Sequence, residues 1–576
     1  MLPQASTNRY ISRFLLASLN IDAVLQETTI HRRRQKLSAM TDGLGLGDAY
    51  DATLGRIKGQ GGGGAELGMA ALMWISHAER PLKADELCHA LAVEIGTPNL
   101  NIDNVPSTGT LLTCCQGLVV VEKEASTVRL IHFTLQEYLR AHPDLFGAAH
   151  STMAETCLSY LNSQQAKAFS ISAPPNFQDT PFLEYSSLYW GVHAKRDTSD
   201  CAEQLALKLF DDGCDRHIST KILLEAQEMY WYSMDFDKPS LFGGLHYASF
   251  FGITEIVAGL VEMDGCNVNQ MDFTGNTPLH WAAWNGHEGV VKTLLERGSL
   301  SPDKPDNSGR RPLHHAAGRG YEETVKILLG LEGVNPDTSD NNGRTPLWWA
   351  ASNGHEGVMK MLLERDDVSP DKPNKDGQTP FWWAAFNGHE GAMEMLLEQG
   401  QVNPDKPDNI GRTPIFIASC YGREGVVKIL LGRDDVNPDK PDNDGKTPLW
   451  WAACNAHEGV VKTLLEQGEI NPDKPDYMGR TPLLIAASYG QDEVVKILLG
   501  RGANPDIPNI NDRTPLYLAA WNGQEGVVKM LLGRDDVNPN KLDKDGKTPL
   551  DRATERGRQG VIALLQPPES AAPSLP

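Results

Sequence analysis

The chain has 576 residues, more than one packed core accommodates, so we expect several domains or one long repeat array. Hydrophobic residues account for 40% and charged residues for 22% of the sequence, as in folded rather than disordered proteins. The net charge of −22 excludes nucleic acid as a partner, because phosphates bind clustered positive charge, and the nine cysteines include no C-x-x-C pair that would indicate a zinc site.

The N-terminal segment ends at a run of glycines. Gly59–Gly64 is glycine at every position except Gln60, so the sequence predicts a flexible hinge over residues 59–65. Residues 1–58 before it are expected to be helical. Their most apolar run, Ile11–Leu19, is too short to span a bilayer, and no later segment reaches about 18 uncharged apolar residues. We therefore expect a soluble, cytoplasmic chain without membrane insertion.

Residues 66–142 carry the pattern of a small helical domain with a β-hairpin. The apolar spacing over residues 66–97 predicts two helices, and Ser107–Cys115 predicts a third. Two β-rich runs, at residues 117–122 and 127–132, predict a hairpin. Three helices and a hairpin wing indicate a winged helix. The third helix contains no lysine or arginine, so we do not expect this domain to bind DNA.

Four short segments of this domain carry a resemblance to a known family: Ala78–Leu82, His89–Val93, Gly117–Val119 and Ile131–Leu139. They are similar to the winged-helix domain that follows the NACHT NTPase module in fungal STAND proteins, a domain family named after GPI inositol-deacylase. Residues 1–58 resemble the helical end of a NACHT module. Residues 143–239, which include Pro181–Tyr185 and Tyr189–Ala194, resemble the helical spacer before the repeats of those proteins.

The resemblance also gives His132 a role. In related NOD-like ATPases, a winged-helix histidine within H-x-S-x-Q-E-[FY] contacts the phosphate of bound ADP, and His132 with Gln136–Tyr138 matches this pattern. The chain contains no G-x-x-x-x-G-K-[ST] loop to cradle a phosphate. We therefore expect His132 to be structural, and we expect neither a nucleotide nor another cofactor to bind.

From about residue 240 the sequence repeats itself. The motif T-P-L-H-W-A-A at Thr277–Ala283 returns as T-P-L-W-W-A-A at Thr345–Ala351, and successive anchors lie 34 residues apart, with one spacing of 33. With a degenerate first copy at Leu245–Ala248, ten copies span residues 240–566. A fixed period of this length indicates a solenoid. Residues 567–576, rich in proline, serine and alanine, are expected to form a disordered tail.

Each copy carries the signals of two short helices. In residues 374–407, Thr379 suits the N-cap of a first helix and Pro380 its first position, where no N–H is needed. Gly388 ends this helix, and the apolar face of Met393–Leu397 predicts a second. This array is identified as a member of the ankyrin-repeat family. The expected fold is mainly α, with a helical and winged-helix N-terminal region followed by an ankyrin solenoid of about ten repeats.

Membership of the ankyrin family implies a concave surface of turn tips and inner helices that binds protein partners. Aromatic residues and arginines dominate interface energies, and at the variable positions the candidate partner-binding residues are Trp284, Arg319, Trp348, Trp382, Phe386, Arg412, Tyr421, Trp450, Tyr477, Tyr489 and Trp521. One tip departs from the pattern, because Asp512 replaces its turn glycine. Recurring His-Glu pairs such as His355-Glu356 lack the second histidine of H-E-x-x-H, so no metal site is expected.

Three repeats carry a tryptophan pair, at Trp348-Trp349, Trp382-Trp383 and Trp450-Trp451. In one interpretation the second tryptophan of each pair fills a slot between repeats that leucine or isoleucine fills elsewhere. In the other, the first tryptophan, which replaces the usual histidine, forms an indole ladder on the concave face. The sequence leaves both interpretations open.

The sequence therefore indicates a non-catalytic scaffold for protein–protein interaction. The resemblance implies the sensor part of a fungal STAND-like protein, which would bind its partner on the concave ankyrin face. Two alternatives remain open: a standalone ankyrin adaptor such as a substrate receptor, and part of a signalling NTPase whose P-loop core lies outside this chain. An enzyme is not expected, because the chain contains neither a P-loop nor a G-x-S-x-G nucleophile motif.

Overall fold

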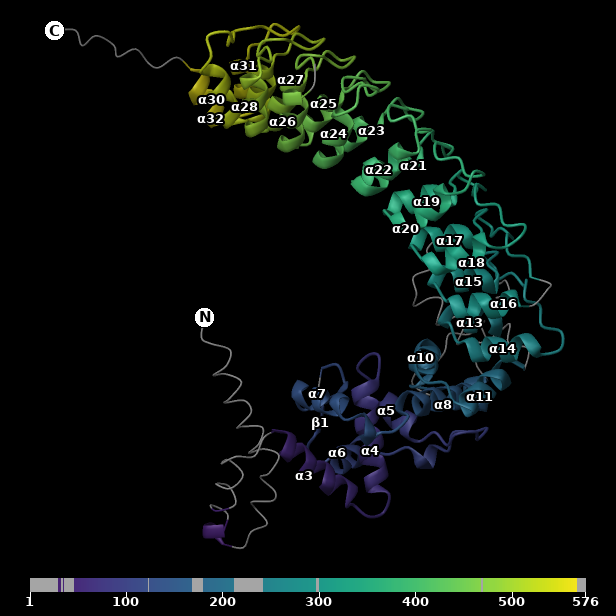
Figure 1. The fold of residues 1–576 in the computed structure, drawn as a ribbon. Coiled ribbons are helices and arrows are strands. Elements are labelled where there is room, and N and C mark those ends of the chain that lie inside the picture. Colours follow the sequence, from purple (N-terminus) through teal and green to yellow (C-terminus); the bar gives the residue numbers. More distant parts are fainter. Residues whose placement is uncertain are drawn as a thin grey trace. The chain divides into compact units, whose positions relative to one another are not determined.

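The computed structural model describes most of the chain, and its internal contacts divide it into two compact bodies (Figure 1). The N-terminal body comprises residues 1–282 and 289–300, and the C-terminal body residues 283–288 and 301–576. The described residues are 29–32, 35, 46–122, 124–167, 180–211, 242–296, 300–467 and 470–566. Most of the segment expected to resemble a NACHT end, parts of the spacer and the whole expected tail lie outside them.

The N-terminal body contains the predicted winged helix, and the described helix α3 comes directly before it. Its elements are α3 (Leu46–Lys58), α4 (Gly64–His77), α5 (Ala84–Leu91), η1 (Ile102–Asn104), α6 (Thr108–Cys114), β1 (Val119–Val121), β2 (Val128–Leu130) and α7 (Phe133–Ala141). The two strands pair in antiparallel fashion with Val119 opposite Leu130. Leu72, Leu87 and Leu111, one from each helix of the three-helix core, are fully buried. The prediction of three helices and a wing is confirmed.

Side-chain caps determine where these helices begin. Ser107 accepts a hydrogen bond from the backbone N–H of Thr110 at 3.1 Å, at the start of α6. Glu86 accepts from the backbone N–H of Lys83 at 2.8 Å and pairs with Arg80, at the start of α5. Glu86 is buried, so these bonds and the favourable helix dipole compensate its loss of hydration.

The glycine-rich segment joins two helices of one packed bundle. Gly62 and Gly63 adopt φ of 63° and 79°, in the left-handed region that favours glycine. On α3, Tyr50 forms a hydrogen bond with Thr134 of α7 at 2.8 Å. A Cβ on Gly68 of α4 would lie 2.7 Å from a backbone oxygen of α6, so this glycine permits the close approach. Over residues 59–63, where the sequence predicts a hinge, a short turn links α3 to α4, and α3 packs on the winged helix.

The described part of the predicted spacer is helical and has an aromatic core. Its elements are η2 (Pro143–Leu145), α8 (Ala149–Leu161), α9 (Gln164–Lys167), α10 (Leu183–Arg196) and α11 (Asp200–Asp211), and α8 packs against both α10 and α11. Trp74 of α4 lies edge-on to Phe182 and Tyr185, with ring centroids 5.4 and 5.9 Å apart. All three rings are buried, so they join the winged helix to the spacer.

Ten helix pairs follow among the described residues, one for each predicted repeat. They are α13 (Gly244–Phe251) and α14 (Thr254–Glu262), α15 (Pro278–Asn285) and α16 (Glu288–Leu295), α17 (Pro312–Arg319) and α18 (Glu322–Leu329), α19 (Pro346–Asn353) and α20 (Glu356–Leu363), α21 (Pro380–Asn387) and α22 (Glu390–Glu398), α23 (Pro414–Cys420) and α24 (Glu424–Leu431), α25 (Pro448–Cys454) and α26 (Glu458–Gln467), α27 (Pro482–Tyr489) and α28 (Asp492–Gly500), α29 (Pro515–Asn522) and α30 (Glu525–Leu532), and α31 (Pro549–Glu555) and α32 (Gln559–Leu565).

The threonine N-cap predicted from one repeat recurs in the C-terminal body at α19, α21, α23, α25, α27, α29 and α31, whereas α17 has Arg311 at this position. Thr379 accepts a hydrogen bond from the backbone N–H of Trp382 at 3.1 Å, with proline at the first helical position. Gly388 closes the helix with a φ of 84°. At the tip where Asp512 replaces glycine, its φ is 58°, so the turn keeps the geometry of the other tips. Within this body, first helices pack against neighbouring first helices, and second helices against second helices.

Ion pairs across the loops add to this packing of neighbouring repeats. The lysine of the recurring D-K-P or N-K-L segment reaches back to the aspartate of the preceding repeat. The pairs are Lys372–Asp337, Lys406–Asp371, Lys440–Asp405, Lys474–Asp439 and Lys541–Asp506, at 2.7–3.0 Å. In each pair the carboxylate is the less exposed partner, so the same contact is made at successive joints of the array.

Candidate interaction surface

The turn tips and the exposed residues of the first helices in the C-terminal body form the candidate surface, which we call the tip face. At most tips an aspartate organises the turn, and Asn374 and Asn509 take its place at two of them. Asp340 accepts hydrogen bonds from the backbone N–H groups of Asn342 and Arg344, both at 2.9 Å. Its second oxygen accepts from Nε of Arg344 at 2.8 Å. The aspartate side chain is fully buried while the arginine is 22% exposed, so the tip presents the cation outward.

The first tryptophan of each pair is buried rather than displayed. Trp348, Trp382 and Trp450 are 4%, 2% and 4% exposed. The indoles of Trp382 and Trp450 donate to the backbone oxygen of the next tip, at Arg412 and Arg480, both at 3.0 Å. The position therefore fills the joint between repeats. The interpretation of these residues as an exposed indole ladder is wrong, and they cannot touch a partner without rearrangement.

The second tryptophan of each pair is partly exposed, and Trp383 joins an aromatic cluster. Trp383 lies 5.1 Å from Trp348 of the preceding repeat and 4.9 Å from Phe386, measured between ring centroids. Phe386 in turn lies 4.4 Å from Tyr421 of the following repeat. Phe386 is partly exposed and Tyr421 is 48% exposed. The cluster therefore crosses three repeats and presents aromatic surface on the tip face.

Cations lie over the aromatic rings along this face. Arg344 lies 4.3 Å from the ring of Trp349, and Arg412 lies 5.3 Å from that of Trp382. In an earlier repeat, Arg319 lies 4.5 Å from the ring of Trp284. Such contacts hold a guanidinium against an apolar surface while its edge stays in water. Among the other candidates, Tyr477 and Tyr489 are 73% and 59% exposed.

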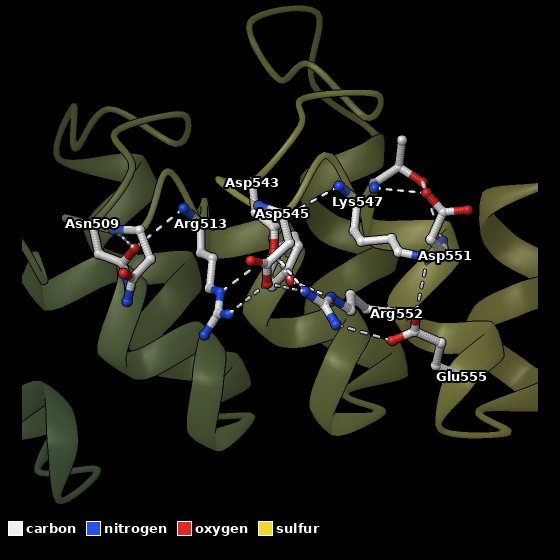
Figure 2. A network of polar contacts seen from close by, with 11 residues as sticks. Asn509, Arg513, Asp543, Asp545, Lys547, Asp551, Arg552 and Glu555 are labelled. Atoms are coloured by element: carbon white, nitrogen blue, oxygen red, sulfur yellow. Dashed lines mark hydrogen bonds and ion pairs between the residues drawn. The ribbon is translucent and has the colours of Figure 1, made fainter.

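The last two repeats are joined by a charged network (Figure 2). Arg552 pairs with Asp543 at 3.0 Å and Asp545 at 2.6 Å, and its Nη1 reaches Glu555 at 3.0 Å. Its Nε donates to the hydroxyl of Tyr517 at 2.6 Å. Burial alone would raise the pKa of Asp543, but hydrogen bonds from Tyr517, the Lys547 backbone and Arg552 hold it well below its usual value. The candidate residue Trp521 lies beside this network, 5.4 Å from the Arg552 guanidinium.

His132, the nucleotide-contact candidate, caps a helix. Its Nδ1 accepts a hydrogen bond from the backbone N–H of Thr134 at 3.3 Å, at the first turn of α7. The same atom contacts the Thr134 hydroxyl at 2.8 Å. One ring nitrogen of His132 therefore caps the N-terminus of α7.

Sequence reasoning missed a histidine cluster in the N-terminal body. Nδ1 of His150 lies 2.9 Å from Nδ1 of His193, and Nε2 of His193 lies 2.9 Å from the Tyr185 hydroxyl. His77 lies beside His150, with ring centroids 5.5 Å apart. Burial, reinforced by the charges of His150, Arg196 and His77, lowers the pKa of His193 to about 3. These residues come from α4, α8 and α10, so only the tertiary fold brings them together.

Neither a metal cluster nor a membrane span is found in the part of the chain that the structure describes. Within those residues, no group of three or more histidine, cysteine, aspartate or glutamate side chains is arranged to hold a metal ion. None of the described helices has the length and apolar character needed to cross a bilayer.

The fold and this surface together define a helical-repeat solenoid joined to a winged helix. The family model for ankyrin repeats matches residues 220–306, 299–374, 366–442, 432–509 and 492–572, which together exceed half of the chain. The chain belongs to the ankyrin-repeat family. The model for the winged helix domain of GPI inositol-deacylase matches residues 57–150, which confirms the second resemblance. A comparison with curated proteins finds no match.

Proposed function

We propose that the chain is a non-catalytic scaffold that binds a protein partner on the tip face. The observation that carries this proposal is the aromatic cluster of Trp383, Phe386 and Tyr421, which spans two repeats, contacts Trp348 of a third and is flanked by partly exposed arginines. Aromatic and arginine side chains are the types that contribute most binding energy at interfaces. Ankyrin arrays are interaction modules, and this one lies within a chain that belongs to that family.

We further propose that the chain is the recognition part of a STAND-like, NACHT-associated protein of fungal type that acts in the cytoplasm. The winged-helix match supports this role, together with the described helices of the spacer. In this arrangement the array binds the partner and the winged helix transmits the event to an NTPase core. Direct binding of ATP or ADP to the purified chain, measured by calorimetry, would contradict the proposal that this chain itself carries no nucleotide site.

Site-specific photo-crosslinking in cells tests the proposed binding surface. A benzophenone amino acid replaces Tyr421 or Tyr489 on the tip face, and, as matched controls, the exposed Lys360 or Lys496 on second helices. We expect cross-linked partner from the two tyrosine positions and not from the two lysine positions. Cross-links that arise only from the lysine positions, or from no position, would overturn the proposed surface.

A further inference from the structure

The two halves of each repeat differ in charge. Over residues 272–566, the tips and first helices, up to the start of each second helix, contain 15 basic and 13 acidic residues. The second helices and the loops that follow them contain 18 basic and 30 acidic residues. The acidic character of the array therefore resides outside the tip face, although the net charge of the whole chain is −22.

Burial makes this difference larger at the surface. The tip aspartates Asp340, Asp408 and Asp476 have side chains at most 1% exposed, whereas their partners are 22–33% exposed. These partners are Arg344, Arg412 and Arg480. Each aspartate accepts hydrogen bonds from backbone N–H groups of its own turn. A ligand that approaches the tip therefore contacts the exposed edge of the arginine guanidinium. At physiological salt, charges more than about 8 Å away are largely screened, so the acidic second helices repel an acidic ligand on the tip face only weakly.

Beneath this face, cations rather than acceptors lie beside two buried indole N–H groups. In the fifth repeat, Nε1 of Trp383 donates to the side-chain oxygen of Gln378 at 2.9 Å. The equivalent tip residues are Arg344 beside Trp349 and Lys446 beside Trp451, and neither of these side chains can accept a hydrogen bond. Among the described residues, Nε1 of Trp349 and Nε1 of Trp451 have no hydrogen-bond partner. Each cation instead lies over its indole, at 4.3 and 5.2 Å from the ring.

We propose that the tip face between residues 340 and 490 binds an extended acidic segment of a protein that also carries aromatic residues. Carboxylates of the segment pair with the exposed edges of Arg344, Arg412 and Arg480. The aromatic side chains of the segment pack on the exposed cluster around Tyr421. This inference rests on the proposed function and adds the chemical class of the partner.

The spacing of the cations sets a pattern for the acidic segment. Neighbouring packed helices lie about 8–10 Å apart, and an extended chain advances about 3.3 Å per residue. One repeat therefore corresponds to about three residues of the bound segment. The cations stand at Arg344, Arg412, Lys446 and Arg480, with the neutral Gln378 between the first two. The segment is expected to carry carboxylates about three residues apart, with one uncharged position opposite Gln378.

The experiment uses the full chain and a fluorescein-labelled random copolymer of glutamate and tyrosine, with binding followed by fluorescence anisotropy. The fifth repeat supplies the substitution, since it has Asn374 and Gln378 where its neighbours have an aspartate and an arginine, joined at 3.0 Å. Introducing asparagine and glutamine at the same two positions of another tip removes one exposed cation together with its aspartate. The net charge of the chain therefore stays at −22. The tip variant carries Asp340→Asn, Arg344→Gln, Asp408→Asn, Arg412→Gln, Asp476→Asn and Arg480→Gln.

A matched control removes three arginine–aspartate pairs elsewhere on the array. These pairs lie in loops after second helices, where both partners are exposed. The control variant carries Arg365→Gln, Asp367→Asn, Arg433→Gln, Asp435→Asn, Arg534→Gln and Asp536→Asn. We expect the tip variant to raise the Kd for the copolymer about tenfold or more, and the control to change it by less than about twofold. Equal effects of the two variants, or tighter binding of a lysine–tyrosine copolymer to the unmodified chain, would overturn the proposal.

A single substitution covers the case in which the tip variant unfolds. Lys446→Gln introduces at one tip the residue that another tip already has, and its partner Asp444 is 72% exposed, so no buried charge is left unpaired. We expect weaker copolymer binding and a smaller dependence of Kd on salt; an unchanged Kd contradicts the proposal. If the photo-crosslinks at Tyr421 capture a partner while the copolymer does not bind, the face is an interaction surface for another chemical class. If the cross-links fail as well, the proposed function itself is wrong.

Discussion

At the scale of single residues, one position in the first helix takes several different side chains while the backbone stays helical. Trp348, Leu484 and His314 occupy it in different repeats, and all three are buried. His314 accepts a hydrogen bond from the backbone N–H of Arg311 at 3.1 Å, and its other nitrogen lies 3.2 Å from the backbone oxygen of Arg344. Burial, which disfavours the charged imidazole, and the charge of His315 lower the pKa of His314 to about 3. The negative charge of Asp340 acts in the opposite direction.

This pKa predicts a loss of stability in mild acid. An unfolded histidine titrates near 6.5, so between about pH 6.5 and 3 the unfolded chain binds the proton that His314 in the folded chain rejects. The free energy of unfolding therefore falls as pH falls through this range. His314→Trp keeps a donor for the Arg344 oxygen, as Trp382 has for the next tip. We expect this variant to recover on the order of 1–2 kcal/mol at pH 5, measured by urea unfolding, and to gain nothing of this kind at pH 8.

At the scale of helices, the first helix of most repeats ends in a glycine with positive φ, but one ends differently. Ala456 follows α25 with a φ of 58°, where Gly354, Gly388 and Gly490 stand in other repeats with φ of 72°, 84° and 73°. A side chain with a Cβ pays roughly 1–2 kcal/mol in this conformation, because the Cβ approaches the carbonyl oxygen. The repeat therefore contains strain that its neighbours avoid.

Replacing Ala456 with glycine is expected to stabilise the array. The relief of strain exceeds the greater freedom that glycine gains in the unfolded chain, so Ala456→Gly should add about 0.5–1 kcal/mol to the free energy of unfolding. Asp512 has the same φ of 58°, but a short polar side chain tolerates it better, so Asp512→Gly should change stability less. Urea midpoints of the two variants decide the matter, and a larger gain for Asp512→Gly would contradict the strain argument.

The same helices show what the sequence predicts and what it does not. Thr379, Pro380 and Gly388 locate a helix because their effect is local, and the structure confirms the caps. Which member of Trp348-Trp349 faces the core is not local, since adjacent positions on an eight-residue helix both border neighbouring helices. The charge of the tip face is present in the sequence, but it appears only when tips and first helices are counted apart from the rest. The net charge of the whole chain, −22, does not reveal this difference between the two halves of each repeat.

At the scale of the whole molecule, the repeats of the C-terminal body form a series of joints in which each repeat contacts its neighbours. Stability in such a solenoid is close to a sum of repeat and interface terms, and an end repeat lacks one interface. Here Asp551 and Arg552 replace the tryptophan pair of other repeats, and Arg552 joins the last tip to Tyr517 of the repeat before it. The polar network of Figure 2 therefore closes the C-terminal end of the array.

Removing Arg552 is expected to loosen the end of the array alone. Arg552→Met removes the guanidinium 3.0 Å from the buried Asp543 and leaves only Arg513, at 3.6 Å, at a cost on the order of 2 kcal/mol, because a buried carboxylate loses a charged partner. Hydrogen exchange followed by mass spectrometry should show faster exchange in α31 and α32, a smaller increase in α29 and no change in α19–α21, because coupling passes only through successive joints. Uniformly faster exchange over residues 301–566 would mean that the array unfolds as one cooperative unit, and unchanged exchange in α31 would mean that the network does not hold the end.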